Sequence, residues 1–372
     1  MVRMSRIGHG GDVHAAAREM GRGFHRLLDF SASINPLGPS TSALRAFGQA
    51  TPLLRHYPDP TCWDLRHALA AHWRRPAGEF LIGNGSTELI HLLPTALQIR
   101  HLLIVGPTFS EYAAAIKRCG GRVSMVMANR ADGYRPPIED LHALLHGITR
   151  GGNDRLPIDA LFLCNPNSPT GQVCEAAAVR RLARLAARRG LWFLVDETFV
   201  EYCGDASILS QALPARTVVL RSFTKFYGLP GLRVGYVTAK PHIIARIAAY
   251  QPPWSVNMPA QRAAKAALQD VRHAGQSLRF MDQERAWLLK GLERLPGCSV
   301  FPSAANFILM ELPVGLKAGT AVAALRRQGL LIRDCSQVPG LNTRSVRVAV
   351  RTRVENERLL TALSQALCGD GA

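Results

Sequence analysis

Short apolar runs alternate along the chain with longer stretches in which apolar residues recur at helical spacing. Between residues 100 and 240 these runs are continuously apolar, a pattern typical of strands that are buried on both faces of a parallel sheet. Six runs are predicted as strands, at residues 101–105, 122–127, 159–164, 191–197, 217–221 and 232–237. Helical stretches alternate with them, so the pattern predicts an α/β fold with a mostly parallel central sheet and helices on both faces.

A different pattern begins after Pro259. Residues 260–295 read as one long helical stretch, and the apolar runs beyond it are mixed with two helices. These runs lie at residues 298–301, 306–312, 330–334 and 345–350. The change predicts a smaller α+β domain in the C-terminal part of the chain.

The composition is that of a soluble globular protein. Of the 372 residues, 47% are hydrophobic and 19% are charged, which excludes a disordered chain. No apolar run is long enough to cross a membrane, and the first 21 residues lack the apolar core of an export signal. We therefore expect a cytoplasmic protein without a membrane partner. The eight cysteines show no metal-ligand spacing, so we predict reduced thiols and no metal site.

The net charge of +18 raises the question of nucleic-acid binding. Much of this charge comes from arginines on predicted helices. Arg180, Arg184 and Arg188 form a stripe at i, i+4 spacing, opposite Leu182 and Leu185. A solvated helix face explains this stripe better than a nucleic-acid surface does. We find no helix-turn-helix and no aromatic RNA-binding motif, so we predict no nucleic-acid partner. A basic protein still attracts small anionic molecules.

Lysine is rare in this chain, and one lysine has unusual neighbours. Only six of the 45 basic residues are lysines, and Lys225 lies in the segment RSFTKFYGLPGLRVGY, residues 221–236. A deprotonated lysine condenses with aldehydes to a Schiff base, which arginine cannot do. Ser222, Thr224 and Arg233 contribute two hydroxyls and a guanidinium, groups that bind phosphate. Pyridoxal phosphate, a phosphorylated aldehyde, is the hypothesis, and a surface lysine in a Gly-rich loop is the alternative.

Two predicted turns supply candidate cofactor contacts, one before a predicted helix and one after a predicted strand. In GNGSTELIHLL, residues 83–93, a turn runs into a helix, so the amides of Ser86 and Thr87 lie at a helix N-terminus, where anions bind. In GPTFSEY, residues 106–112, Phe109 follows a predicted strand and is placed to stack on a flat ring. A position in the hydrophobic core is the alternative for Phe109.

Two polar residues at the ends of predicted strands extend this set. Asn165, in CNPNSPTG at residues 164–171, is a candidate donor to the phenolic oxygen of a cofactor ring. Asp196, in VDET at residues 195–198, ends an apolar strand, where an isolated charge is very costly. A protonated pyridine nitrogen would pair with this carboxylate and keep the ring an electron sink. A structural salt bridge is the alternative.

Taken in order, these motifs resemble a known family. The chain has an SxxK motif with an arginine eight residues later, and it also has NPNSPTG and DE. With these motifs it resembles the fold-type I pyridoxal phosphate enzymes of the aspartate aminotransferase superfamily, near the histidinol-phosphate aminotransferases. The resemblance implies a fold-type I PLP-dependent transferase fold and pyridoxal 5'-phosphate (PLP) as the cofactor. It also implies that Lys225 is the Schiff-base lysine and that Lys225 and Asp196 are the catalytic residues.

Five further segments resemble a narrower group, the threonine-phosphate decarboxylases of cobalamin biosynthesis. The segments are HGGD (9–12), LLDFSASINPLGP (27–39), RHYPDP (55–60), LLIRDCS (330–336) and VRVAVRTRVENERLL (346–360). This resemblance covers nearly the whole chain. It implies PLP-dependent decarboxylation of L-threonine O-3-phosphate to (R)-1-aminopropan-2-yl phosphate and CO2.

The same resemblance implies roles for individual residues. Tyr57 is expected to reach the cofactor phosphate of the neighbouring subunit, which implies a homodimer with shared active sites, and Arg347 is expected to hold the substrate carboxylate. The other expected substrate residues are His9, Gly10, Ser33, Asn165 and Arg333, with His9 and Arg333 on the substrate phosphate. The expected organisation is a substrate-site segment over 1–40, a large PLP-binding domain over 41–258, and an interdomain helix with the small domain over 259–372.

Two positions depart from these family patterns. Related decarboxylases read SANINP where this chain has Ser33. This replacement shortens one polar contact and leaves the identity of the substrate undecided. Histidinol-phosphate aminotransferases carry a tyrosine where this chain has Phe199, which disfavours but does not exclude that activity. A histidinol-phosphate-type aminotransferase is therefore the alternative function, and a non-catalytic binding role is the third hypothesis.

Overall fold

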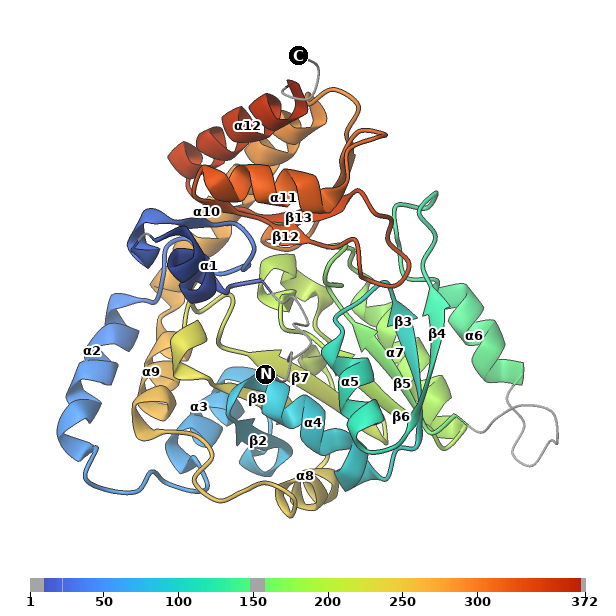
Figure 1. Ribbon diagram of the computed structural model, residues 1–372. Helices are drawn as coiled ribbons and strands as arrows, with labels where there is room; N and C mark the ends of the chain where they lie inside the picture. Colours follow the sequence, from blue (N-terminus) through green and yellow to red (C-terminus); the bar gives the residue numbers. More distant parts are fainter. Residues whose placement is uncertain (1–9, 22, 148–157, 369–372) are drawn as a thin grey trace.

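A seven-stranded sheet forms the centre of the protein (Figure 1). The structure, a computed structural model, describes residues 10–21, 23–147 and 158–368. The spatial order of the strands is β2 (Phe80–Gly83), β8 (Gly235–Thr238), β7 (Thr217–Ser222), β6 (Trp192–Asp196), β5 (Ala160–Cys164), β3 (His101–Gly106) and β4 (Arg122–Met127). Neighbouring strands from β7 to β4 run parallel, whereas β8 is antiparallel to both β7 and β2.

The mostly parallel sheet predicted from the sequence is confirmed, with two differences. The apolar pattern does not predict β2, because its four residues are too short a run to distinguish a strand from the start of a helix. The direction of β8 follows from its connection to β7. Residues 223–234 contain only a short 3-10 turn, and a parallel return needs a longer crossover that is usually a helix.

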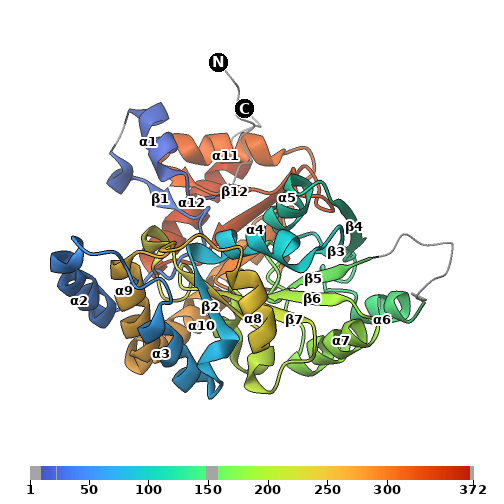
Figure 2. The same cartoon turned by 90° about the horizontal axis from the view of Figure 1, so that it is seen from below.

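Helices cover both faces of this sheet, which explains why its inner strands are apolar throughout. One face carries α4 (Gly85–Leu97), α5 (Glu111–Arg118) and α8 (Pro241–Ala248), and the other carries α6 (Ile138–Gly147) and α7 (Ala176–Arg188). Figure 2 shows α4 and α5 on one side of β5–β7 and α6 and α7 on the other. Along β3, Ile104 lies in the core beneath the first set and Val105 in the core beneath the second. Each such buried side chain contributes roughly 1.5–3 kcal/mol, so a polar residue here requires a partner.

The predicted solvent-exposed arginine stripe on α7 is wrong at one position. Arg184 and Arg188 are exposed, but Arg180 is buried. Its guanidinium donates to the backbone carbonyls of Ile208 and Ala212, in and just after a 3-10 turn. This turn packs on α7. The part of the helix that the hydrophobic pattern predicts to be solvent-exposed at Arg180 is therefore covered by a later segment of the chain.

A second, antiparallel sheet is built by the C-terminal part of the chain. Its spatial order is β12 (Arg333–Asp334), β13 (Ser345–Ala349), β10 (Phe307–Glu311) and β9 (Ser299–Phe301), and α11 (Ala318–Arg327) and α12 (Arg353–Cys368) accompany it. This arrangement confirms the smaller α+β domain of the predicted fold. The predicted domain boundaries stay predictions.

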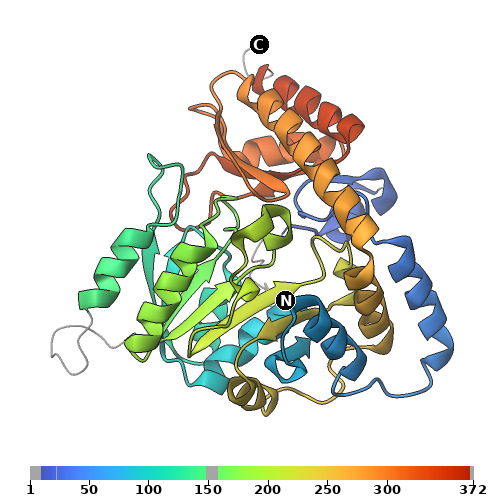
Figure 3. The ribbon, with the colours of Figure 1, turned by 180° about the vertical axis from the view of Figure 1, so that it is seen from behind.

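The long helical stretch predicted after Pro259 is two helices, α9 (Met258–Gln269) and α10 (Val271–Glu293). Asp270 separates them, because its backbone leaves the helical conformation and its side chain accepts a hydrogen bond from the amide of His273. Figure 3 shows α10 leading from α9 toward the second sheet.

The N-terminal elements contact both parts of the molecule. After α1 (Val13–Met20), the short strand β1 (Leu28–Asp29) pairs in parallel with β11 (Leu330–Leu331). Farther on, α2 (Thr41–Ala50) and α3 (Trp63–Trp73) both pack on α9. Within the described residues no helix has the length and apolarity needed to span a bilayer, and the cysteines whose side chains are described are free. The expected cytoplasmic location stays a prediction.

Glu311, at the end of β10, ties the second sheet to the connection that follows β4. Its carboxylate is fully buried and accepts three hydrogen bonds from Arg130, at 2.8–2.9 Å, and one from the Tyr134 hydroxyl, at 3.2 Å. Burial alone would raise the pKa of Glu311, but the hydrogen bonds and charge of Arg130 outweigh it and hold that pKa below its ordinary value of 4.5. This contact joins the two sheets through one buried charge.

Glu311→Gln should lower the free energy of unfolding by roughly 1.5–3 kcal/mol, because it removes charge-assisted hydrogen bonds from a buried position. The lowered pKa means that this stabilisation is present above pH 4.5 and is lost as the pH falls below it. Urea unfolding of both proteins near neutral pH and at acid pH measures both effects. The control is Asp282→Asn, which breaks an ion pair with Arg285 whose carboxylate is 63% exposed. An equal loss in both variants would contradict the prediction.

Candidate active site

The predicted site residues follow strands that share one direction. Strands β3, β5, β6 and β7 are parallel neighbours, so their carboxyl ends lie at one edge of the sheet. Phe109 follows β3, Asn165 follows β5, Asp196 is the last residue of β6, and Lys225 follows β7. Residues that are far apart in the sequence are therefore brought to the same edge.

Lys225 lies, partly buried, in the connection between β7 and β8, where its carbonyl accepts a hydrogen bond from the amide of Asn35. Burial lowers the pKa of its amine to about 8, and the positive charges of Arg347 and Arg233 act in the same direction. Asp196 is among the carboxylates that oppose this shift. A lysine with such a pKa has an appreciable fraction of free amine near neutral pH, as a nucleophile needs.

Two glycines bring a guanidinium and a helix N-terminus together beside Lys225. Gly85 is the first residue of α4, and a Cβ there would lie 2.5 Å from Nη2 of Arg233. A Cβ on Gly235 would lie 2.6 Å from the amide nitrogen of Ser86. Gly235 pairs across the sheet with Ser222, so the hydroxyl pair of the β7 end adjoins the same place. Neither glycine can carry a side chain without separating these groups.

The same place has the donors that a phosphate requires. Ser86 and Thr87 lie in the first turn of α4, where backbone amides have no partner within the helix. The hydroxyls of Ser222 and Thr224 are 2.9 Å apart and almost fully buried. Together with Arg233 these groups are suited to bind an anion, and their predicted contact with the cofactor phosphate stays a prediction.

Asp196 is 4% exposed, and it receives two hydrogen bonds but no cation. Its Oδ2 accepts from the Tyr112 hydroxyl and its Oδ1 from the amide of Thr198, both at 2.8 Å. Burial raises the pKa of Asp196, and the hydrogen bonds from Thr198 and Tyr112 oppose this shift. In the described part of the chain no arginine, lysine or histidine forms an ion pair with it. The alternative of a structural salt bridge therefore has no support among these residues.

Tyr112 is a site residue that the sequence pattern does not reveal. Its ring stacks on Phe162 at 3.9 Å and meets the edge of Phe109 at 5.6 Å. Burial raises its pKa well above 10, so the hydroxyl stays protonated and donates to Asp196. The residue stands in the GPTFSEY motif, but nothing local shows that its hydroxyl meets a strand end 84 residues away.

Asn165 is used by its own turn. Its Nδ2 donates to the carbonyl of Cys174 at 3.1 Å, and its Oδ1 accepts from the amide of Cys174 at 2.7 Å. Its predicted contacts with cofactor and substrate stay predictions. In the same turn, Ser168 accepts a 2.9 Å hydrogen bond from Nη1 of Arg347, and no sequence signal distinguishes this serine.

Two arginines lie side by side on adjacent strands of the second sheet. Arg333 of β12 is the register partner of Arg347 of β13, an arrangement of like charges that is unfavourable by itself. The Arg347 guanidinium lies over the Phe307 ring at 4.7 Å. Burial lowers the pKa of Arg347 to about 10. Among the described residues neither arginine has a carboxylate partner, so both are available to anions.

The remaining predicted residues are placed as follows. Gly10 packs on Ser31, and Ser33 is buried with an Oγ that has no hydrogen-bond partner. Tyr57 is 79% exposed and lies against the Trp254 ring at 4.9 Å. His9 lies outside the described residues. The roles proposed for these residues stay predictions.

Comparison with known proteins identifies the family. Residues 25–363 match the family of class I and II aminotransferases. The chain belongs to this family. It is 36% identical to threonine-phosphate decarboxylase of Salmonella typhimurium, over 97% of each chain. It is 35% identical to histidinol-phosphate aminotransferase of Symbiobacterium thermophilum, over 99% of this chain and 98% of the relative. The crystal structure of L-threonine-O-3-phosphate decarboxylase from Porphyromonas gingivalis superposes with a TM-score of 0.77, at 26% identity, over 92% and 99% of the two chains.

The cofactor of this member of the class I and II aminotransferase family is PLP, and the residues described above fit it. Lys225 would supply the amine for the aldehyde, and the start of α4 with Ser222, Thr224 and Arg233 would hold the phosphate. Among the described residues the buried carboxylate of Asp196 has no cationic partner, and the pyridine nitrogen would provide one. PLP supplies an electron sink for a bond broken at the substrate Cα.

In protein stripped of its cofactor, added PLP should attach covalently to Lys225. The attachment rate should rise as the pH increases through about 8 and level off above it, because only the deprotonated amine is nucleophilic. Visible absorbance measures the rate, and borohydride reduction with peptide mapping locates the attachment. Lys225→Ala should lose it, while Lys290→Ala, at an exposed position on α10, should keep it. An undiminished reducible adduct in Lys225→Ala would refute the assignment.

Proposed function

We propose that the protein decarboxylates L-threonine O-3-phosphate to (R)-1-aminopropan-2-yl phosphate and CO2, a step of cobalamin biosynthesis. The observation that carries this proposal is the Arg333–Arg347 pair, which has no carboxylate partner in the part of the chain that the structure describes. A substrate with both a carboxylate and a phosphate provides one anion for each guanidinium, whereas a simple amino acid leaves one charge unpaired. The names of the Salmonella and Porphyromonas relatives support the same substrate.

Histidinol-phosphate-type transamination is the second candidate, because a relative of that name is 35% identical to this chain. Two observations favour the decarboxylase. Histidinol phosphate carries only one anionic group, so it leaves one arginine of the pair unmatched. Phe199, which stands where those aminotransferases carry a tyrosine, packs edge-on against Phe307 at 5.0 Å and has no hydroxyl to offer a cofactor.

In the proposed reaction, Arg347 binds the substrate carboxylate and sets the direction of its bond to Cα. PLP would supply the electron sink for the breaking bond, and the orientation that Arg347 gives to the carboxylate would favour loss of CO2 over loss of the Cα proton. Arg333 binds the phosphate and holds the other end of the substrate. Lys225, with a pKa of about 8, delivers a proton to Cα after CO2 has left. Asp196 would pair with the pyridine nitrogen and keep it protonated.

We also propose that the protein acts as a homodimer with shared sites. The rings of Tyr57 and Trp254 are in contact, but these side chains are still 79% and 48% exposed. Three further apolar side chains near Tyr57 in the sequence are also exposed: Leu44, Phe47 and Leu54. Exposed aromatic and aliphatic groups of this kind are typical of an interface.

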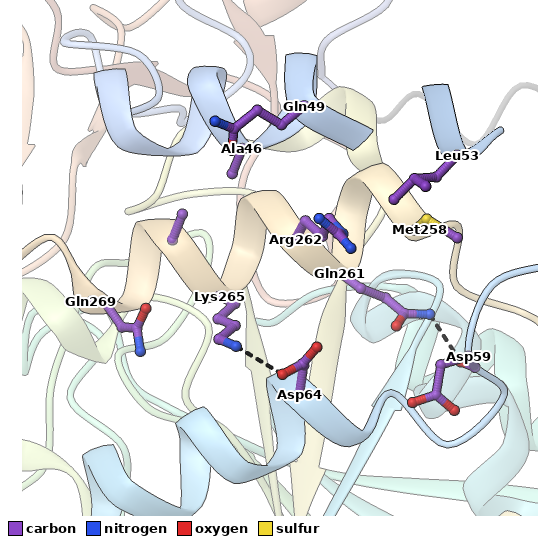
Figure 4. Close-up of a pocket in the computed structure, with 11 residues that line it drawn as sticks. Ala46, Gln49, Leu53, Asp59, Asp64, Met258, Gln261, Arg262, Lys265 and Gln269 are labelled. Carbon is purple, nitrogen blue, oxygen red and sulfur yellow. Dashed lines mark hydrogen bonds and ion pairs between the residues drawn. The ribbon is translucent and has the colours of Figure 1, made fainter. Parts of the chain in front are cut away.

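The surface between α2, α3 and α9 is also hollowed, with a volume of about 400 Å3 (Figure 4). None of the predicted catalytic, cofactor or substrate residues lines this hollow. Its walls mix apolar and polar side chains, and polar groups in them are paired with each other: Gln261 donates to the Asp59 carbonyl at 3.0 Å and Lys265 pairs with Asp64 at 2.8 Å. The hollow therefore fits the rim of a subunit interface better than it fits a substrate pocket.

The proposed substrate is tested by comparing O-phosphothreonine with threonine. CO2 release should be far faster from the phosphate ester, and Arg333→Ala should reduce this preference about tenfold or more, because it removes a charge-assisted contact. Covalent attachment of PLP should not change in this variant. Arg327→Ala, at an exposed position on α11, is the matched control. Equal use of threonine by the unmodified protein would exclude this function, and rapid transamination of histidinol phosphate would establish the alternative.

Shared sites are tested by subunit exchange. Lys225→Ala and Tyr57→Phe should each be inactive or weak alone, but a mixed dimer has one site without either defect if Tyr57 serves the partner's cofactor. Activity should therefore recover after mixing, toward roughly a quarter of the unmodified level for equal, random exchange. Verified exchange without recovery would show that each subunit holds a complete site.

A further inference from the structure

The orientation of Arg347 depends on two neutral oxygen atoms from different parts of the chain. Nη1 donates to Oγ of Ser168, and Nη2 donates to the backbone carbonyl of Ser31, both at 2.9 Å. The Nε–H has no partner among the described residues. Because neutral acceptors hold the guanidinium without cancelling its charge, it stays both oriented and able to bind an anion.

The Ser31 carbonyl belongs to a turn that is held from one side by Asp29. Oδ1 of Asp29 accepts hydrogen bonds from the Ser31 amide at 2.8 Å, from Oγ of Ser31 at 2.5 Å and from the Ala32 amide at 3.3 Å. Asp29 is itself fixed by β1, where it pairs with Leu331 of β11. The turn over residues 29–32 is therefore anchored to the C-terminal part of the molecule.

The N-terminal segment rests on the other side of the same turn. The amide of Gly11 donates to Oγ of Ser31 at 2.8 Å. Gly10 lies so close that a Cβ there would be 2.1 Å from the Ser31 carbonyl oxygen and 2.6 Å from its carbon. No real Cβ reaches such a distance, so any side chain at residue 10 must displace the segment or the carbonyl that Arg347 uses.

We propose that the turn over residues 29–32 positions Arg347 for the substrate carboxylate, and that Gly10 is required because its missing side chain lets the N-terminal segment seat this turn. Gly10, Asp29 and Ser31 are then positioning residues that act through Arg347. This inference rests on the proposed function, in which Arg347 binds a carboxylate. It differs from the expected role of Gly10 as a direct substrate contact.

The test uses two unreactive ligands that differ only in the carboxylate. The first is 3-(phosphonooxy)butanoate, which is phosphothreonine without its amine, and the second is isopropyl phosphate, which also lacks the carboxylate. Neither can attach to the cofactor, so calorimetric titration of the PLP-loaded protein reports binding without turnover. The unmodified protein should bind the first ligand about tenfold or more tighter than the second, the contribution of a charge-assisted contact.

Gly10→Ala should reduce this preference about tenfold while changing the affinity for isopropyl phosphate by no more than about twofold. Ser31→Ala is the second variant, since it removes the hydroxyl that joins the turn to Gly11 and Asp29, and it should show the same selective loss. The matched control is Gly78→Ala, where the added methyl would lie 3.9 Å from Pro241, an ordinary contact, and where the preference should not change.

The outcomes separate this inference from the proposed function. If the unmodified protein shows no preference for the carboxylate, Arg347 does not bind it, and the proposed function fails together with the inference. If the preference is present but survives in Gly10→Ala and Ser31→Ala, the inference alone is overturned. Equal weakening of both ligands in these variants also overturns it, because that result places the effect on the phosphate or on the site as a whole.

Discussion

A carboxylate buried at the end of a doubly covered strand constrains everything around it. Asp196 ends β6 beside Cys164 of β5 and Leu220 of β7, and almost none of its surface meets water. Tyr112 and Thr198 satisfy two of its lone pairs, but they bring no positive charge. Burial disfavours the charged form of this carboxyl, so a cation at the strand edge would stabilise it, and we propose the pyridine nitrogen of PLP as that cation. In the proposed site, Asp196 would hold one end of the cofactor and the start of α4 would hold its phosphate.

Two positive charges of the site act on the amine of Lys225. Arg233 at the α4 end and Arg347 on β13 both lower the pKa of Lys225, in addition to burial. The arginines that attract anions therefore also release the proton that keeps Lys225 from acting as a nucleophile. Anion binding beside Lys225 and the proton affinity of its amine are linked by the same electrostatics.

The site depends on how the two sheets are held together. Arg347 comes from the C-terminal sheet, but its acceptors come from the turn after β5 and from the segment after β1. The buried Glu311–Arg130 contact and the β1–β11 pair join the same two parts of the molecule at other points. A guanidinium misplaced by even 1 Å loses much of its value to a reaction, so these distant ties bear on the chemistry.

The sequence by itself determined the positions of most strands, the α/β class, and the candidate Lys225, Asp196 and phosphate-binding groups. These features follow from local periodicity and from side-chain chemistry at strand ends. Both can be read from the sequence without knowing which residues are in contact in the folded protein. Only the tertiary structure decided the antiparallel direction of β8, the burial of Arg180, the use of Asn165 by its own turn, and the contacts of Tyr112, Ser168 and Ser31. The contacts of Arg180, Tyr112, Ser168 and Ser31 depend on which backbone carbonyl or side chain arrives from a segment elsewhere in the fold. Hydrophobic periodicity records that a residue faces the interior, but it does not record which partner it meets there.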